Sequence, residues 1–212
     1  MHIRRYRPSD HDAIGDICVA TGDSGGDARG KFVDDQLLAW VYAYPYLEFA
    51  PDLCWVVEDE GEVLGYIVGV ENVESFSRWW AEKWTPRLEE AYPPSLPMDP
   101  ASNRVREVGL HPERMAPSYR QAYPAELHID LLPETQGRGV GTDMMQTFIA
   151  ELMRRGIGGL AIGVGARNPG ALAFYKRLGF EVLKTHVAEG KPVAYTLKLD
   201  LSEKPSSGKT GN

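Results

Sequence analysis

The sequence has few cysteines, no long hydrophobic run and no apolar leader. Only two cysteines occur among its 212 residues, and Cys18 and Cys54 each lie in an apolar segment, which favours buried, reduced thiols. No apolar run approaches the ~20 residues of a membrane helix. The basic N-terminal residues are not followed by an apolar stretch. We therefore expect a soluble, cytoplasmic protein with no signal peptide and no membrane partner.

Positive charge is also scarce. The 23 lysines and arginines are outnumbered by 30 aspartates and glutamates, which gives a formal net charge of -7. Because binding to a phosphate backbone needs a concentrated excess of basic side chains, we expect no nucleic-acid partner. A solvated strand edge explains the short basic run of Arg4, Arg5 and Arg7.

The histidines and cysteines do not form a metal motif. The five histidines are scattered along the sequence, and no Cys/His set has metal-ligand spacing, so we expect no metal. Otherwise the composition is that of a globular chain, with 43% hydrophobic and 25% charged residues. We expect one domain over residues 1–201, as a monomer or a homodimer. The small, polar tail over 202–212 is expected to be disordered.

Apolar periodicity predicts a mixed order of strands and helices in the first half of the chain. A strand over residues 3–7 should lead into a helix that is capped at the turn after it. The β-rich runs over 53–58 and 63–70 flank a turn and predict a hairpin. Helical periods cover 32–44 and 76–91.

Residues 92–124 are rich in proline and have no periodic pattern. A connection of this length is uncommon unless it is functional or packs as an irregular insert. We expect an irregular insert that covers one side of the functional cleft.

The second half of the chain begins with an alternating segment, Ala125–Leu132. Since successive side chains of a strand point to opposite faces, Glu126, His128 and Asp130 share one face. The other face carries Leu127, Ile129 and Leu131. The pattern predicts a strand with one polar face.

A helix, a strand, a second helix and two further strands should follow. The helical period over 139–155 and the apolar strand over 160–164 complete a βαβ unit, so the two flanking strands should be parallel neighbours. A helix opens at Asn168-Pro169 and stops at Gly179. Two terminal strands are expected over 180–187 and 193–199.

A glycine-rich turn, Gln136-Gly137-Arg138-Gly139-Val140-Gly141, lies between the alternating strand and the next helix. Free N–H groups at a helix start can hold a diphosphate, and the helix dipole favours its charge. Glycines permit close approach, and Arg138 adds a positive charge. The turn matches neither the Walker loop nor the Gly-x-Gly-x-x-Gly dinucleotide pattern. Packing of a turn against a helix would also explain the glycines.

Two motifs resemble those of the GNAT N-acetyltransferase superfamily. One is Gln136-x-x-Gly139-x-Gly141 after a strand that ends in Leu-Leu-Pro, and the other is Asn168-Pro-Gly-Ala-Leu-Ala-Phe-Tyr175-Lys-Arg-Leu-Gly179-Phe180. The segment is most similar to bacterial members related to the acetyltransferase-like domain of O-GlcNAcase. The resemblance implies an α/β fold with a mixed central sheet of about six to seven strands. The sheet should splay between strands 4 and 5, with helices on both faces.

The same resemblance implies a site for acetyl-CoA as co-substrate. Leu131 and Leu132 should pair through their backbone with the pantetheine arm, and Asn168 should bind near its amide. Tyr175 would protonate the departing thiolate, although a tyrosine in this helix could instead simply fill the core. The implied cofactor residues are Leu131, Leu132, Gln136, Gly137, Arg138, Gly139, Val140, Gly141, Thr142, Asn168, Phe174 and Tyr175.

Transfer of an acetyl group to an amine also needs a group that takes the amine proton. Glu126, His128 and Asp130 are the candidates for this base, unless they only form hydrogen bonds with their neighbours. Neither cysteine lies in the motif region, so we expect direct attack in a ternary complex rather than an acyl-cysteine intermediate.

Two other functions are compatible with the glycine-rich turn. The chain could be a non-catalytic acyl-CoA sensor or interaction module, because binding requires only the loop, or a regulator that binds ATP there. If the chain is an enzyme, its acceptor is an amine-bearing small molecule or protein. Acidic residues over 21–49 are compatible with a cationic amine or with a solvated acidic face.

Overall fold

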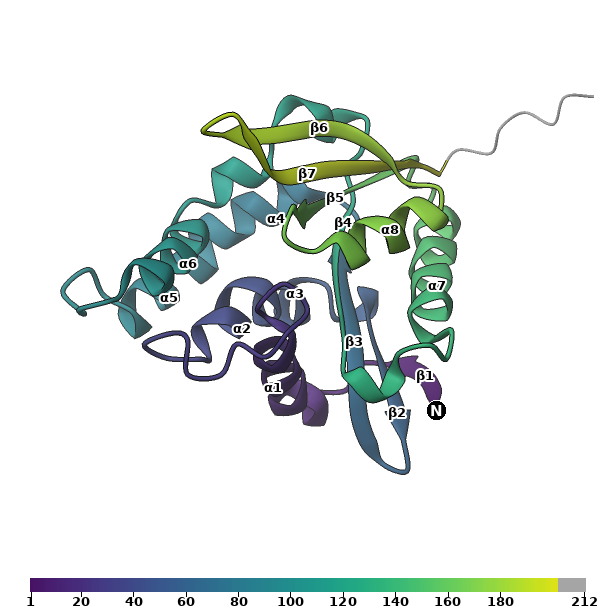
Figure 1. Ribbon diagram of the computed structural model, residues 1–212, viewed down its shortest axis with the longest axis horizontal. Helices are drawn as coiled ribbons and strands as arrows, with labels where there is room; N and C mark the ends of the chain where they lie inside the picture. Colours follow the sequence, from purple (N-terminus) through teal and green to yellow (C-terminus); the bar gives the residue numbers. More distant parts are fainter. Residues whose placement is uncertain (202–212) are drawn as a thin grey trace, which may run out of the picture.

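The computed structural model describes residues 1–201 and contains seven strands in two antiparallel sheets (Figure 1). One sheet has the order β1-β2-β3-β4 and the other the order β5-β7-β6. The strands are β1 (His2–Arg5), β2 (Cys54–Asp59), β3 (Glu62–Val70), β4 (Glu126–Leu131), β5 (Gly159–Gly165), β6 (Glu181–Ala188) and β7 (Lys191–Asp200). The strand number and the α/β class agree with the prediction.

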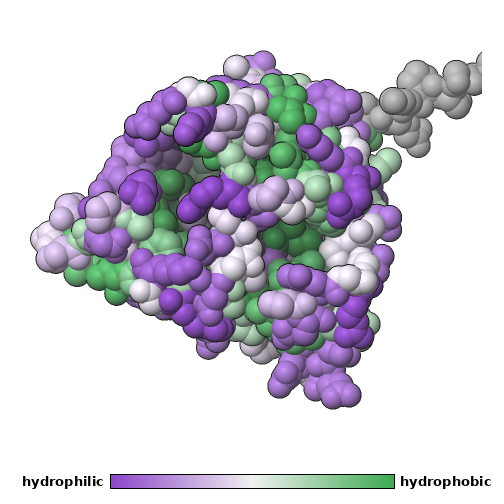
Figure 2. Space-filling view, in the orientation of Figure 1, coloured by the Kyte–Doolittle hydropathy of each residue, from purple (hydrophilic) through white to green (hydrophobic). Residues whose placement is uncertain are grey.

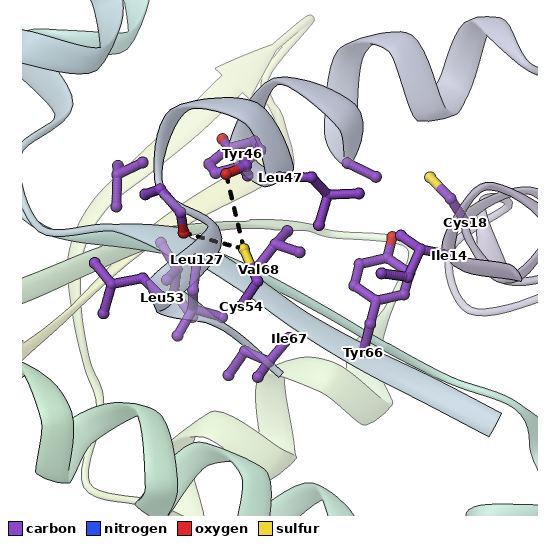
Figure 3. Close-up of a cluster of buried hydrophobic side chains, with 14 of the residues drawn as sticks. Ile14, Cys18, Tyr46, Leu47, Leu53, Cys54, Tyr66, Ile67, Val68 and Leu127 are labelled. Atoms are coloured by element: carbon purple, nitrogen blue, oxygen red, sulfur yellow. Dashed lines mark hydrogen bonds between the residues drawn. The ribbon is translucent and has the colours of Figure 1, made fainter. Parts of the chain in front are cut away.

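The helices lie on both faces of the first sheet (Figure 1). Tyr66 of β3 points toward Cys18 of α1 (Figure 3), whereas Gly69 lies against Phe148 of α7. The two β3 residues differ in parity, so α1 and α7 cover opposite faces. The helices are α1 (His11–Thr21), α2 (Leu37–Tyr42), α3 (Tyr44–Phe49), α4 (Val73–Trp79), α5 (Thr85–Ala91), α6 (Pro100–Leu110), α7 (Val140–Arg154) and α8 (Pro169–Arg177).

The two sheets meet where β4 and β5 begin. A single parallel bridge joins Ala125 to Leu160, and the backbone of Ala125 bonds to Gly159 (3.3 Å) and Ala161 (3.0 Å). Within residues 1–201 no further ladder connects the two strands. The sheet is therefore splayed between its fourth and fifth strands, as the family resemblance implies.

The proline-rich segment over 92–124 is less irregular than its sequence indicates. It contains α6, whose first turn begins at Pro100, and the Asp99 carboxylate caps it by accepting from the N–H groups of Ala101 and Ser102. Proline fits the first turn because its missing N–H would have no intrahelical partner there. The expectation of an irregular insert is corrected in part, since this proline starts a helix.

Two other helices differ from the sequence-based boundaries. The helix expected over 32–44 begins only at Leu37 and is broken at Ala43, where φ is -132°. The helix expected over 76–91 begins at Val73 and continues to Ala91 through a π-helical stretch at Trp80–Trp84. The periodicity thus located the buried faces more accurately than the ends.

The core between α1, α3 and β3 buries both cysteines (Figure 3). The Cys54 thiol contacts the carbonyl oxygens of Ala50 (3.3 Å) and Tyr46 (3.7 Å). Burial raises the pKa of both thiols to about 12, which keeps them protonated. The prediction of buried, reduced thiols is confirmed. Over residues 1–201, no helix combines the length and the apolar character needed to cross a bilayer.

Candidate functional site

The backbone N–H and C=O groups of β4 point alternately toward β3 and toward the gap between β4 and β5. Ala125 bonds to β5, whereas the N–H of Leu132 donates to the Leu64 carbonyl on the β3 side (3.0 Å). Because adjacent residues of an antiparallel strand direct their N–H and C=O groups to opposite edges, Ile129 and Leu131 direct theirs into the gap. The gap therefore offers unpaired strand backbone.

Leu132 does not contribute to this edge. Its N–H is bonded to Leu64, and its carbonyl accepts from the backbone N–H (3.0 Å) and the hydroxyl (2.7 Å) of Thr135. Both of its backbone groups are therefore committed within the protein. The open edge of β4 is therefore formed by Leu131 and by Ile129, which the sequence analysis did not select, rather than by Leu132.

A cleft of about 490 Å³ opens along this edge. Its walls come from β4, from the start of α7 and from α8, and Ser24 and Gly25 close one side. It brings together six of the cofactor residues expected from sequence, namely Leu131, Gln136, Gly141, Asn168, Phe174 and Tyr175.

The glycine-rich turn continues this cleft into a second cavity of about 310 Å³. Gly137 and Gly139 have φ of +72° and +78°, a left-handed backbone that favours glycine, and space is open where their side chains would stand. Gly141 is restricted differently, since a Cβ there would lie 3.1 Å from Leu131. Gly137, Gly139, Val140 and Thr142 line this cavity.

The turn leaves donors free at the start of α7. Thr142 donates the first N–H···O bond of the helix, to Gly139 (2.9 Å), so the N–H groups of Val140 and Gly141 have no intrahelical acceptor. These donors and the dipole of the 15-residue helix favour an anion at this end. The turn can therefore hold a phosphate group.

Arg177 is a cationic neighbour of the turn that the sequence analysis missed. It lines both cavities and forms no ion pair among the described residues, whereas Arg138 lines neither cavity. Arg177 lies three residues after Phe174 and hence on the same helix face. That spacing is the signal by which it could have been found.

Tyr175 is buried beside the cleft, with 8% of its surface exposed. Its ring packs against Phe174 and Phe180, with centroids 5.2 and 5.3 Å away, and its hydroxyl forms no hydrogen bond within residues 1–201. Burial, and then the negative charge of Asp130, raise its pKa above the ordinary value. Tyr175 is thus a protonated phenol whose O–H donates no hydrogen bond within residues 1–201.

Asn168 has a structural task at the same place. Its side-chain oxygen accepts from the Ala171 N–H (2.9 Å) and caps α8. The amide NH₂ group remains available, since Asn168 lines the cleft.

The Asp130 side chain lies on the face of β4 opposite to those of Ile129 and Leu131. It accepts a hydrogen bond from the Tyr66 hydroxyl (2.5 Å). Burial raises the pKa of the Asp130 carboxyl, while hydrogen bonds from Tyr66 and Thr21 act against that shift. The Asp130 charge is felt by Tyr175, so the two groups lie within electrostatic reach. Asp130 is therefore a buried carboxyl with a raised pKa that lies within electrostatic reach of Tyr175.

His128 lies further along β4 in an aromatic environment. Its ring is edge-on to Tyr42 and Tyr46, with centroids 5.6 and 5.2 Å away, and its Nε2 lies 3.2 Å from the Tyr46 hydroxyl. Burial, and then the positive charge of Arg120, lower the pKa of His128 to about 4. The imidazole is therefore neutral at pH 7 and a weak base.

Glu126 is held by a buried ion pair. Its carboxylate contacts the Arg120 guanidinium and accepts from the Tyr46 hydroxyl (2.9 Å). Arg120 also donates to the carbonyls of Ala125 (3.0 Å) and Ala161 (2.9 Å), where the two sheets meet. Glu126 thus neutralises an arginine that joins β4 to β5. This agrees with the alternative in the sequence analysis that Glu126 only forms hydrogen bonds with its neighbours.

A third cavity, of about 230 Å³, lies beside His128 and Glu126. Met115, Tyr119 and Arg120 of the segment over 92–124 form part of its wall. The insert therefore contributes side chains directly to the polar face of β4.

These features match a known family. The sequence model of the acetyltransferase (GNAT) family matches residues 28–180, and the chain belongs to that family. It is therefore an N-acetyltransferase by class.

Two proteins are similar to this chain over most of its length. Protein O-GlcNAcase of Rattus norvegicus is 25% identical over 190 residues, which is 86% of this chain and 20% of that protein. The chain thus spans about a fifth of the length of this curated relative. The crystal structure of SsHAT is 35% identical with a TM-score of 0.86, covering 95% of this chain and 98% of that one. The resemblance stated from the motifs is confirmed.

A more distant structure shares the fold. The putative acetyltransferase yncA of Salmonella typhimurium, solved with its cofactor acetyl-CoA, is 19% identical with a TM-score of 0.56, covering 98% of each chain.

Over residues 1–201 no three His, Cys, Asp or Glu side chains converge as a metal site would require.

Proposed function

We propose that this acetyltransferase uses acetyl-CoA as donor and transfers the acetyl group to a primary amine by direct attack in a ternary complex. The observation that carries the proposal is the continuous path from the open edge of β4 to the glycine-rich turn, with the unoccupied Tyr175 hydroxyl beside it. A thioester arm and a diphosphate need these two environments in this order.

The donor would bind by its backbone-like arm and its phosphates. Ile129 and Leu131 pair with the pantetheine amides, as an added strand would, and the N–H groups of Val140 and Gly141 hold the diphosphate. Arg177 adds positive charge at the phosphates. Asn168 contributes its amide NH₂ group to the arm.

The chemistry needs one proton removed and one supplied. The amine nitrogen attacks the thioester carbonyl, the carbon–sulfur bond breaks, and the nitrogen loses a proton while the sulfur gains one. Tyr175 donates its O–H proton to the sulfur as negative charge develops there, and the phenolate regains a proton from solvent before the next turnover. The raised pKa keeps the phenol protonated until the carbon–sulfur bond breaks. The step requires no covalent enzyme intermediate.

Asp130 is the proposed base among the three candidates. A proton acceptor works best when its pKa lies near the working pH, and burial moves Asp130 toward that range but moves His128 away from it. Glu126 is committed to Arg120 and Tyr46. The hydrogen bond from Tyr66 fixes the Asp130 carboxylate in place.

A thiol-release assay with a panel of primary amines tests this proposal. We expect acetyl-CoA to yield free CoA only when an accepted amine is present, together with the N-acetyl product identified by mass spectrometry. Tight binding of acetyl-CoA without acetylation of any amine in the panel would contradict it and would favour an acyl-CoA-binding module.

A further inference from the structure

A separate cavity of about 480 Å³ lies between the loop after α1, α6 and the start of the β5–α8 connection. It shares no lining residue with the cleft or with the cavity at the glycine-rich turn. Figure 2 shows this face of the molecule hollowed toward the end that carries α6, with a hydrophobic floor and hydrophilic residues around it.

The charged side chains of this cavity are mostly basic. Lys31, Arg104 and Arg167 line it, and Asp23 is the one carboxylate among its lining residues. Asp23 lies 2.5 Å from Lys31 and 3.8 Å from Arg167, while Arg104 has no ion-pair partner within residues 1–201. The cavity therefore carries an excess of positive charge on a chain whose net charge is -7.

Three nearby aspartates, Asp27, Asp34 and Asp35, carry negative charge but do not line the cavity. Asp34 accepts from the Tyr92 hydroxyl (2.8 Å), and Asp35 accepts from the Gly30 N–H (2.9 Å). Asp27 is paired with Arg29 at 3.1 Å. These carboxylates are bonded within their own loop and to Tyr92, outside the cavity.

The basic cavity adjoins the proposed reaction site from two sides. It shares Tyr42 and Val108 with the cavity that contains His128. Its residues Asp23 and Arg167 are chain neighbours of Ser24 and Asn168, which line the cofactor cleft. A molecule in the basic cavity can therefore extend toward the splay between β4 and β5.

We propose that the acceptor is a primary amine that carries an anionic group, a carboxylate or a phosphate, at its far end. Lys31, Arg104 and Arg167 would bind the anion while the amine reaches the splay, and Phe32 and Tyr42 would contact the spacer. This inference rests on the proposed acetyl transfer. The phosphates of the donor have a separate place at the glycine-rich turn.

Matched amines test the proposal by binding and by turnover. The pairs are phenethylamine with 4-(2-aminoethyl)benzoate, and glucosamine with glucosamine 6-phosphate, which distinguish a carboxylate from a phosphate. Calorimetry on the CoA-saturated protein measures affinity, and thiol release measures kcat/KM. We expect the anionic member of at least one pair to bind about tenfold more tightly, as a charge-assisted contact provides.

Two variants locate the effect. Arg104→Gln and Lys31→Gln should remove most of the preference for the anionic member and leave the Kd of acetyl-CoA unchanged. Arg78→Gln is the control, because this exposed arginine on α4 is paired only locally, with Glu74 at 2.9 Å. It makes the same charge change away from the cavity.

The outcomes separate this inference from the function on which it rests. Equal or weaker binding of both anionic members overturns the inference, as does a preference that survives in the Arg104→Gln and Lys31→Gln double variant. Loss of acetyl-CoA affinity in that variant also overturns it, because the cations would then serve the donor. Selective binding of the anionic member without acetylation would uphold the anion site and reject the amine-acetylation proposal.

Discussion

At the scale of single residues, the proposed chemistry depends on two groups whose pKa values burial raises. Burial keeps Tyr175 protonated and makes Asp130 a stronger base, and the charge of Asp130 contributes to the shift of Tyr175. A buried phenol and a buried carboxyl with perturbed pKa values, within electrostatic reach of each other, are what the proposed acid and base roles require.

Tyr175→Phe tests the donor. The hydroxyl is unbonded in the free protein and is used only as the thiolate leaves, so kcat should fall about 100-fold while the Kd of acetyl-CoA and the Tm stay close to those of the parent. Calorimetry and steady-state kinetics measure the two effects. An equal loss of affinity and turnover would make Tyr175 a binding residue instead.

Asp130→Asn tests the base. A base must be deprotonated, so kcat/KM should fall as pH decreases through the raised pKa of Asp130, and this acidic limb should lie above the ordinary carboxyl value of about 3.9. Asp130→Asn should remove the limb and lower kcat/KM about 100-fold. His128→Gln should retain the limb, because burial lowers the pKa of His128 to about 4.

The stability of the Asp130 variant provides the control. Burial disfavours the ionised carboxylate, so the contribution of Asp130 to stability decreases as pH rises through its raised pKa. Asp130→Asn should therefore not lower the Tm at neutral pH, and lost activity could not be attributed to unfolding. Retention of the acidic limb in this variant would exclude Asp130 as the base.

At the scale of elements, the register of β4 decides which amides serve the donor. Hydrogen exchange with and without CoA should show new protection at the amides of Ile129 and Leu131. The amide of Leu132 should be protected in both states by its bond to Leu64 (3.0 Å). New protection confined to Leu132, with none at Ile129 and Leu131, would reject this register.

The start of α7 gives a second test at this scale. Gly139→Glu should abolish the rise in Tm that acetyl-CoA produces, because it places a negative charge where the diphosphate binds. Gly156→Glu is the matched control at the other end of the helix, since both glycines have positive φ, of +78° and +74°, and open space around them. A full acetyl-CoA response in Gly139→Glu would place the phosphates elsewhere.

At the scale of the whole molecule, the strand backbones of the two sheets pair at one place within residues 1–201. A single parallel bridge and the bonds from Arg120 to Ala125 and Ala161 join them, and the splay begins immediately beyond. Arg120 comes from the insert over 92–124. The insert therefore helps to join the two sheets, and it also lines the cavity beside His128.

Glu126→Gln should weaken this joint. Removal of the carboxylate leaves the Arg120 charge buried, with 8% of that residue exposed, and should cost about 3 kcal/mol of unfolding free energy. Urea denaturation measures the loss, and Glu113→Gln in the same insert, on an exposed carboxylate, should cost less than about 1 kcal/mol. An undiminished stability would mean that the ion pair is not needed at the joint.

The sequence alone determined the local chemistry of this protein. The glycines of the turn, the cap at Asn168, the alternation over 125–132 and the two motifs are short-range patterns, and each predicted its element and the family correctly. The prolines of the segment over 92–124 led to a wrong prediction at one place, because Pro100 occupies the first turn of a helix and does not interrupt one. Short-range patterns are reliable because backbone geometry and capping depend on near neighbours.

Only the tertiary structure decided which groups are free and which are committed. The alternation over 125–132 did not indicate that Leu132 bonds to β3 or that Glu126 neutralises Arg120. The sequence likewise did not indicate that the aspartates after α1 bind their own loop. The tertiary structure also brings Lys31, Arg104 and Arg167 around one cavity. Burial, strand pairing and the meeting of distant charges depend on residues far apart in the chain, and these contacts set the pKa values and the free hydrogen-bonding groups on which function depends.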